Sequence, residues 1–399
     1  MRLAIVGAVL LVAGIAAVAV GALPVGDLVA LIDRTAPILA FVVAMTVVTE
    51  LASEAGVFLW IARRLRHWGR GYSLVLWLLV AVSAALCTIF LSLDTTAVLL
   101  TPVVVSVTRQ AGLPVLPFAL TTVWLANTAS LLLPISNLSN LLAQHSLGSV
   151  SPAGFAALMW APSLAAALVP LVFICIVFRR DLRKRYPRIP VNRIRSDRHA
   201  VGERSRGLGD RMLLVIAAAV LALLLPALVS GVVVWIPAAG AAVVLLAAFA
   251  VRRPRVLKVS LVPWSLLLFA AGLFVVMETA RHLGAPLLFA ALAGEGDGTG
   301  DLVRLAASGG LTSNVLNNLP AYLLAEPVAG TPERLAALLI GVNAGPLITP
   351  WASLATLLWH DRLARMNVMI TWKGYAVFGL IVAPLTVLLA ALALAATGW

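Results

Sequence analysis

The sequence predicts an all-α polytopic membrane protein with an inverted-topology repeat, two re-entrant hairpins and two broken transmembrane helices. Three observations predict it: an apolar composition, a pair of matching interrupted segments, and an uneven distribution of charge. Of the 399 residues, 62% are hydrophobic and 11% are charged, and the mean hydropathy is +1.05. Soluble proteins are closer to half apolar and a quarter charged. Since one span takes roughly 20 residues, the chain has room for about ten to twelve spans or re-entrant pieces.

Apolar runs separated by polar turns give the expected order of elements. The first run follows Arg2 and resembles a signal peptide, but it is longer than the usual apolar region of one, so we expect a retained first helix. Spans are expected at 3–22, 35–62, 72–92, 114–133, 152–178, 212–229, 232–251, 262–281, 302–325, 333–348 and 375–396. Shorter pieces, expected to be half-helices or re-entrant arms, lie at 95–107, 137–147, 285–293 and 352–360.

Two distant segments, 125–142 and 341–358, share the sequence pattern of a broken helix. With a shift of 216 (343 − 127), Asn127 aligns with Asn343, Pro134 with Pro350, and Asn137 with Ser353. Each copy is apolar, then polar and interrupted by proline, then apolar again. Unwound backbone is tolerated at membrane depth only where it is buried in protein or lines a cavity. A matched pair of such segments is therefore the best sequence indication of a transporter's binding site.

The basic segment 179–211 divides the chain, with twelve Lys and Arg residues. We expect a first half at 1–178 (repeat core about 35–178), a linker, and a second half at 212–399 (repeat core about 262–397). The linker is interpreted as solvated; docking of anionic lipid or of a cytoplasmic partner is the alternative. Basic residues placed in loops between spans are typical of cytoplasmic loops, not of nucleic-acid binding.

Charge also gives the repeat its direction. The loop 63–70 is basic, whereas its counterpart at 294–301 is acidic. Since basic loops stay cytoplasmic, corresponding loops lie on opposite sides of the bilayer, which predicts inverted topology. The same rule places the N-terminus and 179–211 on the cytoplasmic side of the cell membrane.

Three carboxyls are candidates for proton coupling. Asp94 opens a polar piece after the span 72–92, and a carboxyl inside hydrocarbon should face the bundle or a water-filled cavity. It is a proton or cation site, the N-cap of the next helix, or both. Glu50 and Glu54 lie four residues apart on one helix face, where mutual repulsion favours holding a proton. Glu278, with Arg281 and His282 one turn away, is a weaker candidate because an intrahelical ion pair accounts for it.

The segment 312–320 has three amides beside a proline. It suits the tip of a re-entrant hairpin that meets a ligand, or alternatively a packing network between helices. We find no Gly-rich phosphate loop, zinc-type spacing or nucleophile triad, and the loop 294–301 has too few carboxylates in register to hold calcium. Cys87 and Cys175 are interpreted as small buried hydrophobes. We expect no enzyme activity, no cofactor and no metal site.

Together these motifs resemble those of the arsenical pump membrane proteins (the ArsB family) and, more widely, of the ion transporter superfamily. The resemblance spans nearly the whole chain and is carried by Ser53–Gly56 with Arg66–Gly69, the Asp94 hairpin, Thr128–Leu131 with Ser136–Leu138, Val315–Pro320 and, most specifically, Gly345–Trp359. Departures from the family pattern lie beside the expected site, at Leu93, Thr95-Thr96 and Trp351-Ala352.

The resemblance implies export of arsenite and antimonite in exchange for protons, sometimes with a soluble cytoplasmic arsenite-stimulated ATPase as partner. It implies a substrate site between two hairpin tips and two broken helices, at Asp94, Thr95, Asn127, Ser136, Asn137, Asn314, Asn317, Asn318, Thr349 and Ser353. Asp94, supported by Glu50 or Glu54, would carry the proton. Arsenous acid is uncharged at neutral pH, so a site of amides and hydroxyls suits it.

Three other functions stay open at this point. A sodium/proton antiporter and an organic-anion symporter (for a dicarboxylate or citrate) would keep the fold and change the cargo. A channel-like or scaffold protein that recruits a partner through 179–211 is the option from another class.

Overall fold

The computed structural model describes residues 2–148, 150–186 and 210–397. This part of the chain is helical and holds no β-strand, and seven of its helices are long and apolar enough to cross a bilayer. The predicted all-α polytopic class is therefore confirmed.

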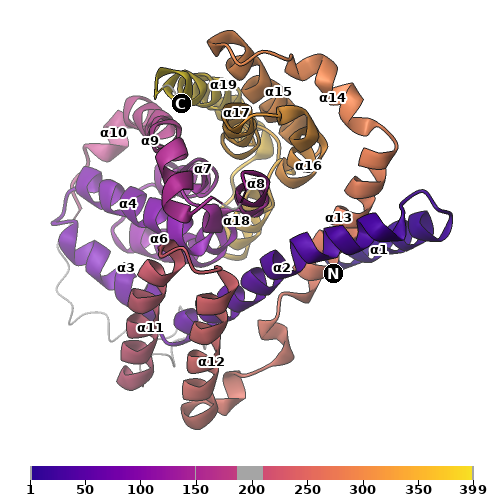
Figure 1. The fold of residues 1–399 in the computed structure, drawn as a ribbon. Helices are drawn as coiled ribbons and strands as arrows, with labels where there is room; N and C mark the ends of the chain where they lie inside the picture. Colours follow the sequence, from indigo (N-terminus) through magenta and orange to yellow (C-terminus); the bar gives the residue numbers. More distant parts are fainter. Residues whose placement is uncertain (1, 149, 187–209, 398–399) are drawn as a thin grey trace.

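The helices before and after residues 187–209 include broken segments in each half (Figure 1). The first half contains α1 Arg2–Ala19, α2 Val25–Glu54, α3 Val57–Trp68, α4 Ser73–Leu91, α5 Leu93–Thr95, a π-helical turn Thr96–Leu100, α6 Thr101–Gln110, α7 Val115–Thr128, α8 Leu138–Ser146, α9 Pro152–Val177 and α10 Arg179–Leu182. The second contains α11 Arg211–Val229, α12 Trp235–Arg252, α13 Trp264–His282, α14 Ala285–Ala293, α15 Thr299–Val315, α16 Asn318–Ala329, α17 Pro332–Ala344, α18 Leu354–Arg365 and α19 Trp372–Thr397.

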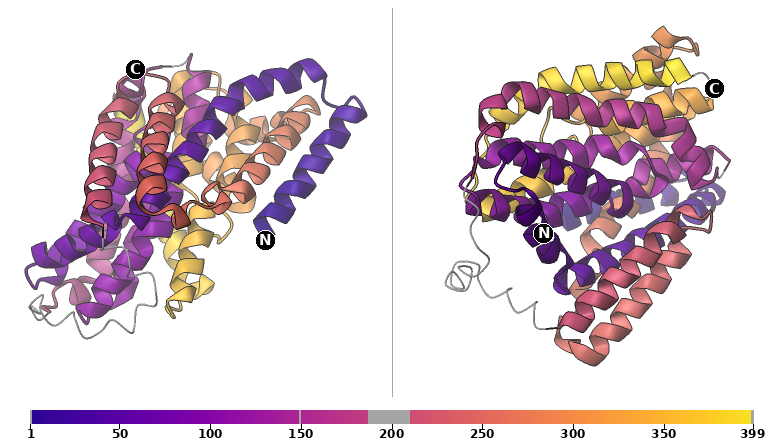
Figure 2. Two further views of the ribbon diagram at one scale, coloured as in Figure 1. Left: turned by 90° about the horizontal axis from the view of Figure 1, so that it is seen from below. Right: turned by 90° about the vertical axis from the view of Figure 1, so that its left-hand side faces the viewer.

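Five helices form an outer layer beside the remaining bundle. In this layer α1 lies along α13, α11 lies along α12, and α2 packs against both α12 and α13 (Figures 1 and 2). The backbones of α1 and α13 come close because Gly7 and Gly272 face each other: a Cβ added at Gly272 would lie 2.7 Å from the Gly7 carbonyl oxygen. Close approach through small residues is typical of helix packing in membranes.

The bundle holds the elements with breaks, and its long helices α9 and α19 lie side by side across one face (Figure 2). Each half contributes a helical hairpin, α4 with α5–α6 or α15 with α16. Each also contributes a broken helix, α7 with α8 or α17 with α18. The hairpin turns at a non-glycine residue of positive φ in both halves, Ser92 (φ 98°) and Asn317 (φ 143°). Such conformations are costly for residues with a side chain and persist only where the surroundings hold them.

Two expected spans are interrupted in the structure. We expected a single helix over 35–62, but α2 starts ten residues earlier and ends at Glu54, and Gly56 at φ 93° begins α3. Gly284, at φ 83°, makes the same break between α13 and α14. We also expected one span over 302–325, where the backbone instead turns at Asn317. Apolar content alone does not reveal these breaks, because each is set by the φ of one residue.

Most of the predicted linker 179–211 lies outside the described residues. Its start is ordered: the Tyr186 amide donates to the Gly71 carbonyl at 2.9 Å, and the Ser73 amide donates to the Lys184 carbonyl at 3.0 Å. The Arg185 guanidinium lies 4.9 Å from the ring centre of Tyr72, in cation–π geometry. This beginning of the linker therefore packs on the turn before α4 and is not a free loop.

Helices α15 and α17 meet through glycines. A Cβ added at Gly341 would clash with the Ala306 carbonyl oxygen and would lie 2.9 Å from the Gly310 amide nitrogen. One added at Gly345 would lie 2.6 Å from the Gly310 Cα. Because these neighbours are backbone atoms, they cannot move aside as a flexible side chain would.

Gly341→Ala should therefore destabilise the protein by about 1–3 kcal/mol through overpacking, measured as a lower unfolding temperature of the purified protein in detergent. Gly240→Ala on α12 is the matched control. It has no atom within 4 Å of the added Cβ, so it should be neutral or stabilising by up to about 1 kcal/mol. Equal effects of the two substitutions would contradict the close packing of α15 and α17.

Candidate functional site

A cavity of about 260 Å³ lies where the two hairpin tips and the two breaks meet. Helices α2 and α13 of the outer layer complete its wall. Its polar lining comes from both halves and consists of Thr46, Thr49, Glu50, Ser92, Asp94, Thr95, Asn137, Ser265, Asn317 and Asn318.

Four helices start at the cavity. Leu93 of α5, Leu138 of α8, Asn318 of α16 and Leu354 of α18 are each the first residue of their helix, and each lines the wall. Helix N-termini carry unsatisfied N–H donors and a partial positive charge. The starts of α5, α8 and α18 can therefore donate hydrogen bonds to oxygen atoms of a small ligand. At α16 the Asn318 amide already donates to the Ala352 carbonyl at 2.9 Å, and the Leu319 amide to Asn317 Oδ1 at 3.3 Å.

Two carboxyls, Glu50 and Asp94, face the same cavity. The Asp94 Oδ1 atom is buried and has no hydrogen-bond partner among the described residues. Asp94 is not the N-cap of the following helix: Ser92 occupies that position, and its hydroxyl accepts from the Thr95 amide at 3.4 Å. The capping interpretation is thus wrong, and binding of a proton or cation by Asp94 stays a prediction.

Glu54 lies apart from Glu50. It is exposed at the end of α2, outside the cavity wall, and its carbonyl accepts from Arg253 Nη1 at 3.3 Å. Glu54 is the last residue of α2, one turn beyond Glu50, and of the two carboxyls only Glu50 lines the cavity with Asp94.

Asn314 holds the break between α17 and α18 against the second hairpin. Its amide nitrogen donates to the carbonyls of Gly310 and Gly345, both at 2.8 Å. Its amide oxygen accepts from the backbone amides of Ile348 and Thr349, both at 3.1 Å. The Thr349 hydroxyl in turn donates to the Asn314 backbone carbonyl at 2.7 Å. All four hydrogen-bonding positions of this side chain are used. In the structure Asn314 and Thr349 hold the backbone of the break in place and do not line the cavity.

The first half has a weaker version of this connection. The Ser136 hydroxyl donates to the Ile89 carbonyl in the last turn of α4, at 2.8 Å. Ser136 is fully buried and outside the cavity lining. Ser353, the residue before α18, is also fully buried, and its hydroxyl has no partner among the described residues.

Asn343 joins the broken helices of the two halves. Its amide oxygen accepts from Asn137 Nδ2 at 2.9 Å and from the Ser139 hydroxyl at 2.8 Å. Its amide nitrogen donates to Asn140 Oδ1 at 2.7 Å, and Asn140 Nδ2 donates to the Ser130 carbonyl at 2.6 Å. This buried network fixes Asn137 at the edge of the cavity.

Asn127, which aligns with Asn343, makes no such connection. It bonds only to the Val123 carbonyl of its own helix, at 2.9 Å, and its amide oxygen is buried without a partner among the described residues. The predicted residues therefore divide into two sets. Those that line the cavity are Glu50, Asp94, Thr95, Asn137, Asn317 and Asn318, and those that do not are Glu54, Asn127, Ser136, Asn314, Thr349 and Ser353.

Sequence reasoning missed part of the site. Thr46, Thr49 and Ser265 lie on apolar helices and carry no motif that marks them, and Ser92 is the turn residue two positions before Asp94. Asn343 was visible as the repeat partner of Asn127, and that alignment was the available signal for its role. The described residues contain no cluster of three or more His, Cys, Asp or Glu that could hold a metal ion.

Long apolar helices, backbone breaks inside the bundle and a buried polar cavity define a multi-pass membrane transporter. The chain belongs to the citrate transporter family, whose model matches residues 2–356. An arsenical pump membrane protein of Yersinia enterocolitica is 30% identical over 398 residues, which cover 94% of this chain and 90% of that protein. Arsenical pump membrane proteins of Escherichia coli and Shigella flexneri are each 29% identical over 373 residues, 88% of this chain and 85% of theirs. The predicted resemblance is confirmed, and these relatives are transporters, not enzymes.

Asn343→Ala should destabilise the protein more than Asn127→Ala. The two substitutions remove the same atoms at repeat-related positions, but only the first leaves the polar groups of Asn137, Ser139 and Asn140 without partners. Each buried group left unpaired costs about 1–3 kcal/mol. The unfolding temperatures of both variants in detergent measure the difference. Equal losses would show that the Asn343 network contributes no more than a single helix-internal bond.

Proposed function

We propose that the protein exports arsenite and antimonite from the cytoplasm across the cytoplasmic membrane in exchange for protons. One observation carries the choice of cargo: the cavity lining contains two carboxyls and many amides and hydroxyls, and its described residues include no Lys, Arg or His. Arsenous acid is neutral at physiological pH and has three hydroxyls that both donate and accept. The helix N-termini and amides suit its oxygens, and the carboxylates suit its O–H groups.

The proton is proposed to bind at Asp94, with Glu50 in support on the facing wall. Both carboxyls share one cavity, and Asp94 has a buried, unpartnered oxygen. Like charges in one site favour protonation of one member. A proton and a neutral substrate can then bind in turn, because protonation of the carboxylate removes the charged hydrogen-bond acceptor on which the substrate's hydroxyls depend.

Alternating access is proposed to follow from inverted topology of the two halves. The basic 63–70 and the acidic 294–301 support opposite orientations of corresponding loops. The same rule supports a cytoplasmic location for the N-terminus and for the basic 179–211 segment. That basic end is where a soluble arsenite-stimulated ATPase is proposed to dock if the chain uses one.

A second candidate is transport of an organic anion such as citrate, because the matching family is named for citrate. Four helix N-termini at the cavity favour an anion. The two carboxyls oppose one, and the lining supplies no cation, among its described residues, to neutralise a tricarboxylate. A sodium/proton exchange uses the same carboxyls and differs only in the cargo.

Asp94→Asn should abolish arsenite uptake driven by an imposed proton gradient in everted membrane vesicles, because the amide cannot bind and release the proton. Asp361→Asn, at an exposed ion pair on α18, is the control and should transport like the wild type. Wild-type uptake by the Asp94 variant would remove this residue from the coupling. Uptake by the unaltered protein that ignored the gradient would refute proton coupling itself.

Arsenite and antimonite should raise the unfolding temperature of the purified protein, whereas citrate and sodium should not. A ligand at 100 times its dissociation constant stabilises the folded state by about 2.7 kcal/mol. Thermal unfolding with the four ligands in parallel, at constant ionic strength, measures this. Stabilisation by citrate alone would favour the organic-anion function over the proposed one.

A further inference from the structure

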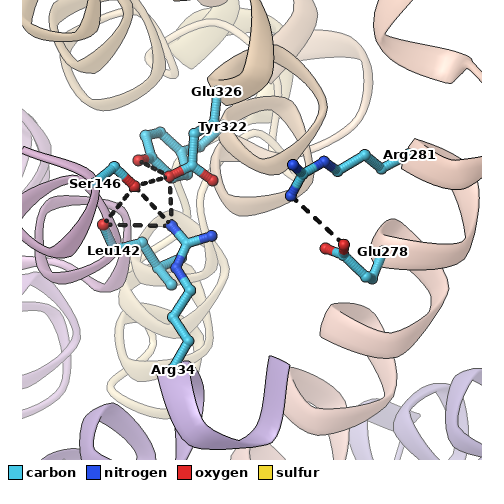
Figure 3. A network of polar contacts seen from close by, with 7 residues as sticks. All are labelled: Arg34, Leu142, Ser146, Glu278, Arg281, Tyr322 and Glu326. Atoms are coloured by element: carbon cyan, nitrogen blue, oxygen red, sulfur yellow. Dashed lines mark hydrogen bonds and ion pairs between the residues drawn. The ribbon is translucent and has the colours of Figure 1, made fainter. Parts of the chain in front are cut away.

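A second polar network lies away from the cavity and joins three elements distant in sequence (Figure 3). Arg34 of α2 forms an ion pair with Glu326 of α16, 292 positions later, and its Nη2 also donates to the Ser146 hydroxyl of α8 at 3.0 Å. The Ser146 hydroxyl bonds to Glu326 as well, and the Tyr322 hydroxyl donates to Glu326 at 2.9 Å. We call these four side chains the Arg34 network.

The network is well shielded from solvent. The side chains of Arg34 and Glu326 are 18% and 12% exposed. Arg34 also lies 3.4 Å from the Leu142 carbonyl near the end of α8. It thus ties α2, a helix of the outer layer, to the ends of α8 and α16, which belong to the broken helix of one half and the hairpin of the other.

Along α2 and α13 the network stands toward one end, and the cavity extends toward the other. On α2 the cavity is lined as far as Glu50, which is 16 residues or roughly 24 Å beyond Arg34. On antiparallel α13 the cavity is lined by Ser265 and Leu266 near the first turn, whereas Glu278 and Arg281 near the last turn lie beside the network. The cavity end is the basic one, because Arg252, Arg253, Arg255 and Lys258 precede α13.

The same helices line both places. Leu138 and Leu141 of α8, Ala270 of α13 and Leu319 of α16 line the cavity. About one turn further along each helix, Leu142, Phe274 and Leu323 line a small void of about 10 Å³ that also touches Arg34 and Glu326. A void of this size holds about one water molecule, so the route from the cavity to the network is closed by apolar side chains.

Beyond the network lies an open vestibule of about 560 Å³, lined by Asp27, Ala30, Leu31, Arg34, Glu278, Arg281 and His282. His282 Nε2 lies 2.8 Å from Asp27 Oδ2, which joins the start of α2 to the end of α13. Arg281 pairs with Glu278 at 3.5 Å, across from the Arg34 network (Figure 3). Four features therefore follow one another between α2, α8, α13 and α16. They are the charged vestibule, the Arg34–Glu326 ion pair, the constriction lined by apolar side chains, and the cavity.

We propose that this sequence of features is the exit route for the cargo, and that the Arg34–Glu326 pair is the gate that closes its far end. In the structure the gate is shut, so it must break each time the cavity opens to the vestibule. Leaving one partner of a shielded pair without the other is strongly unfavourable. The vestibule charges Glu278 and Arg281 provide new partners for the separated Arg34 and Glu326. The location of the gate follows from geometry; its cargo and its place on the outer side of the membrane rest on the proposed function.

The first test closes the gate covalently. The gate variant carries Arg34→Cys and Glu326→Cys in a Cys87→Ala/Cys175→Ala background. Intact cells that contain this variant are treated with a short reducible thiol cross-linker, and everted vesicles are then prepared from them. Gradient-driven arsenite uptake should fall to background and return on reduction. Asp361→Cys with Arg365→Cys, four residues apart on α18, is cross-linked within one helix and should keep its uptake. Full uptake by the cross-linked gate variant would overturn the proposal.

The second test is independent of the cargo. A reporter thiol at Thr46→Cys on the cavity wall, where the side chain is partly exposed, in the same cysteine-free background, is labelled in intact cells by a membrane-impermeant maleimide. With the native gate, labelling from outside should be slow. With Arg34→Gln and Glu326→Gln together, which remove both charges and leave neither unpaired, it should become severalfold faster. Reactivity in everted vesicles, which expose the basic end, should be high in both and shows that both are folded.

Equal labelling from outside with and without the neutral pair would overturn the gate. Faster labelling together with no arsenite uptake by any variant would support the gate and refute the cargo. The two proposals therefore fail in distinguishable ways.

Discussion

The structure depends on how the unwound backbone at the two helix breaks finds hydrogen-bond partners inside an apolar bundle. A peptide group without a partner costs several kcal/mol in hydrocarbon, where no water is available. The chain meets this requirement with amide and hydroxyl side chains. Asn314 serves two carbonyls and two amides at the break of the second half, and Ser136 reaches the hairpin of the first. Because these side chains hold the breaks open, the N-termini of the following helices can point at one cavity.

The two halves use matching positions for different purposes. Asn343 bonds to three side chains of the first half, whereas Asn127, its counterpart, bonds only to its own helix. Aligned positions in the two halves therefore make different contacts, and the bonds of Asn343 connect one half to the other.

Charge is separated along the same helices. The cavity holds carboxyls without cations in its described lining, and the cations of α2 and α13 stand in the Arg34 network and the vestibule. The proposed neutral cargo and proton suit a lining that supplies hydrogen-bond acceptors. An ion pair at the far end, by contrast, gives a contact that is either formed or broken, which suits a gate between two states.

The membrane class, the long helices and the places where polar residues interrupt apolar runs were all predictable from the sequence, whereas the lining of the cavity required the fold. Composition, span length and the positions of Asn and Pro are local properties that can be read along the chain. The sequence also indicated Asp94 and Glu50 as carboxyls of the site, because a charge within an apolar run is costly unless it faces a cavity or a partner.

Packing then selected which candidates face the cavity. Asn314 and Thr349 looked like ligand groups, yet their hydrogen bonds are consumed by backbone that is 31 to 35 residues away in sequence. Glu54, one turn beyond Glu50 at the exposed end of α2, lies outside the cavity wall. Arg34 and Glu326 stand in unrelated spans and meet only in the fold. The cause is the same in each case: a polar side chain in an apolar bundle takes whichever partner the neighbouring helices bring near, and that choice is not local to the sequence.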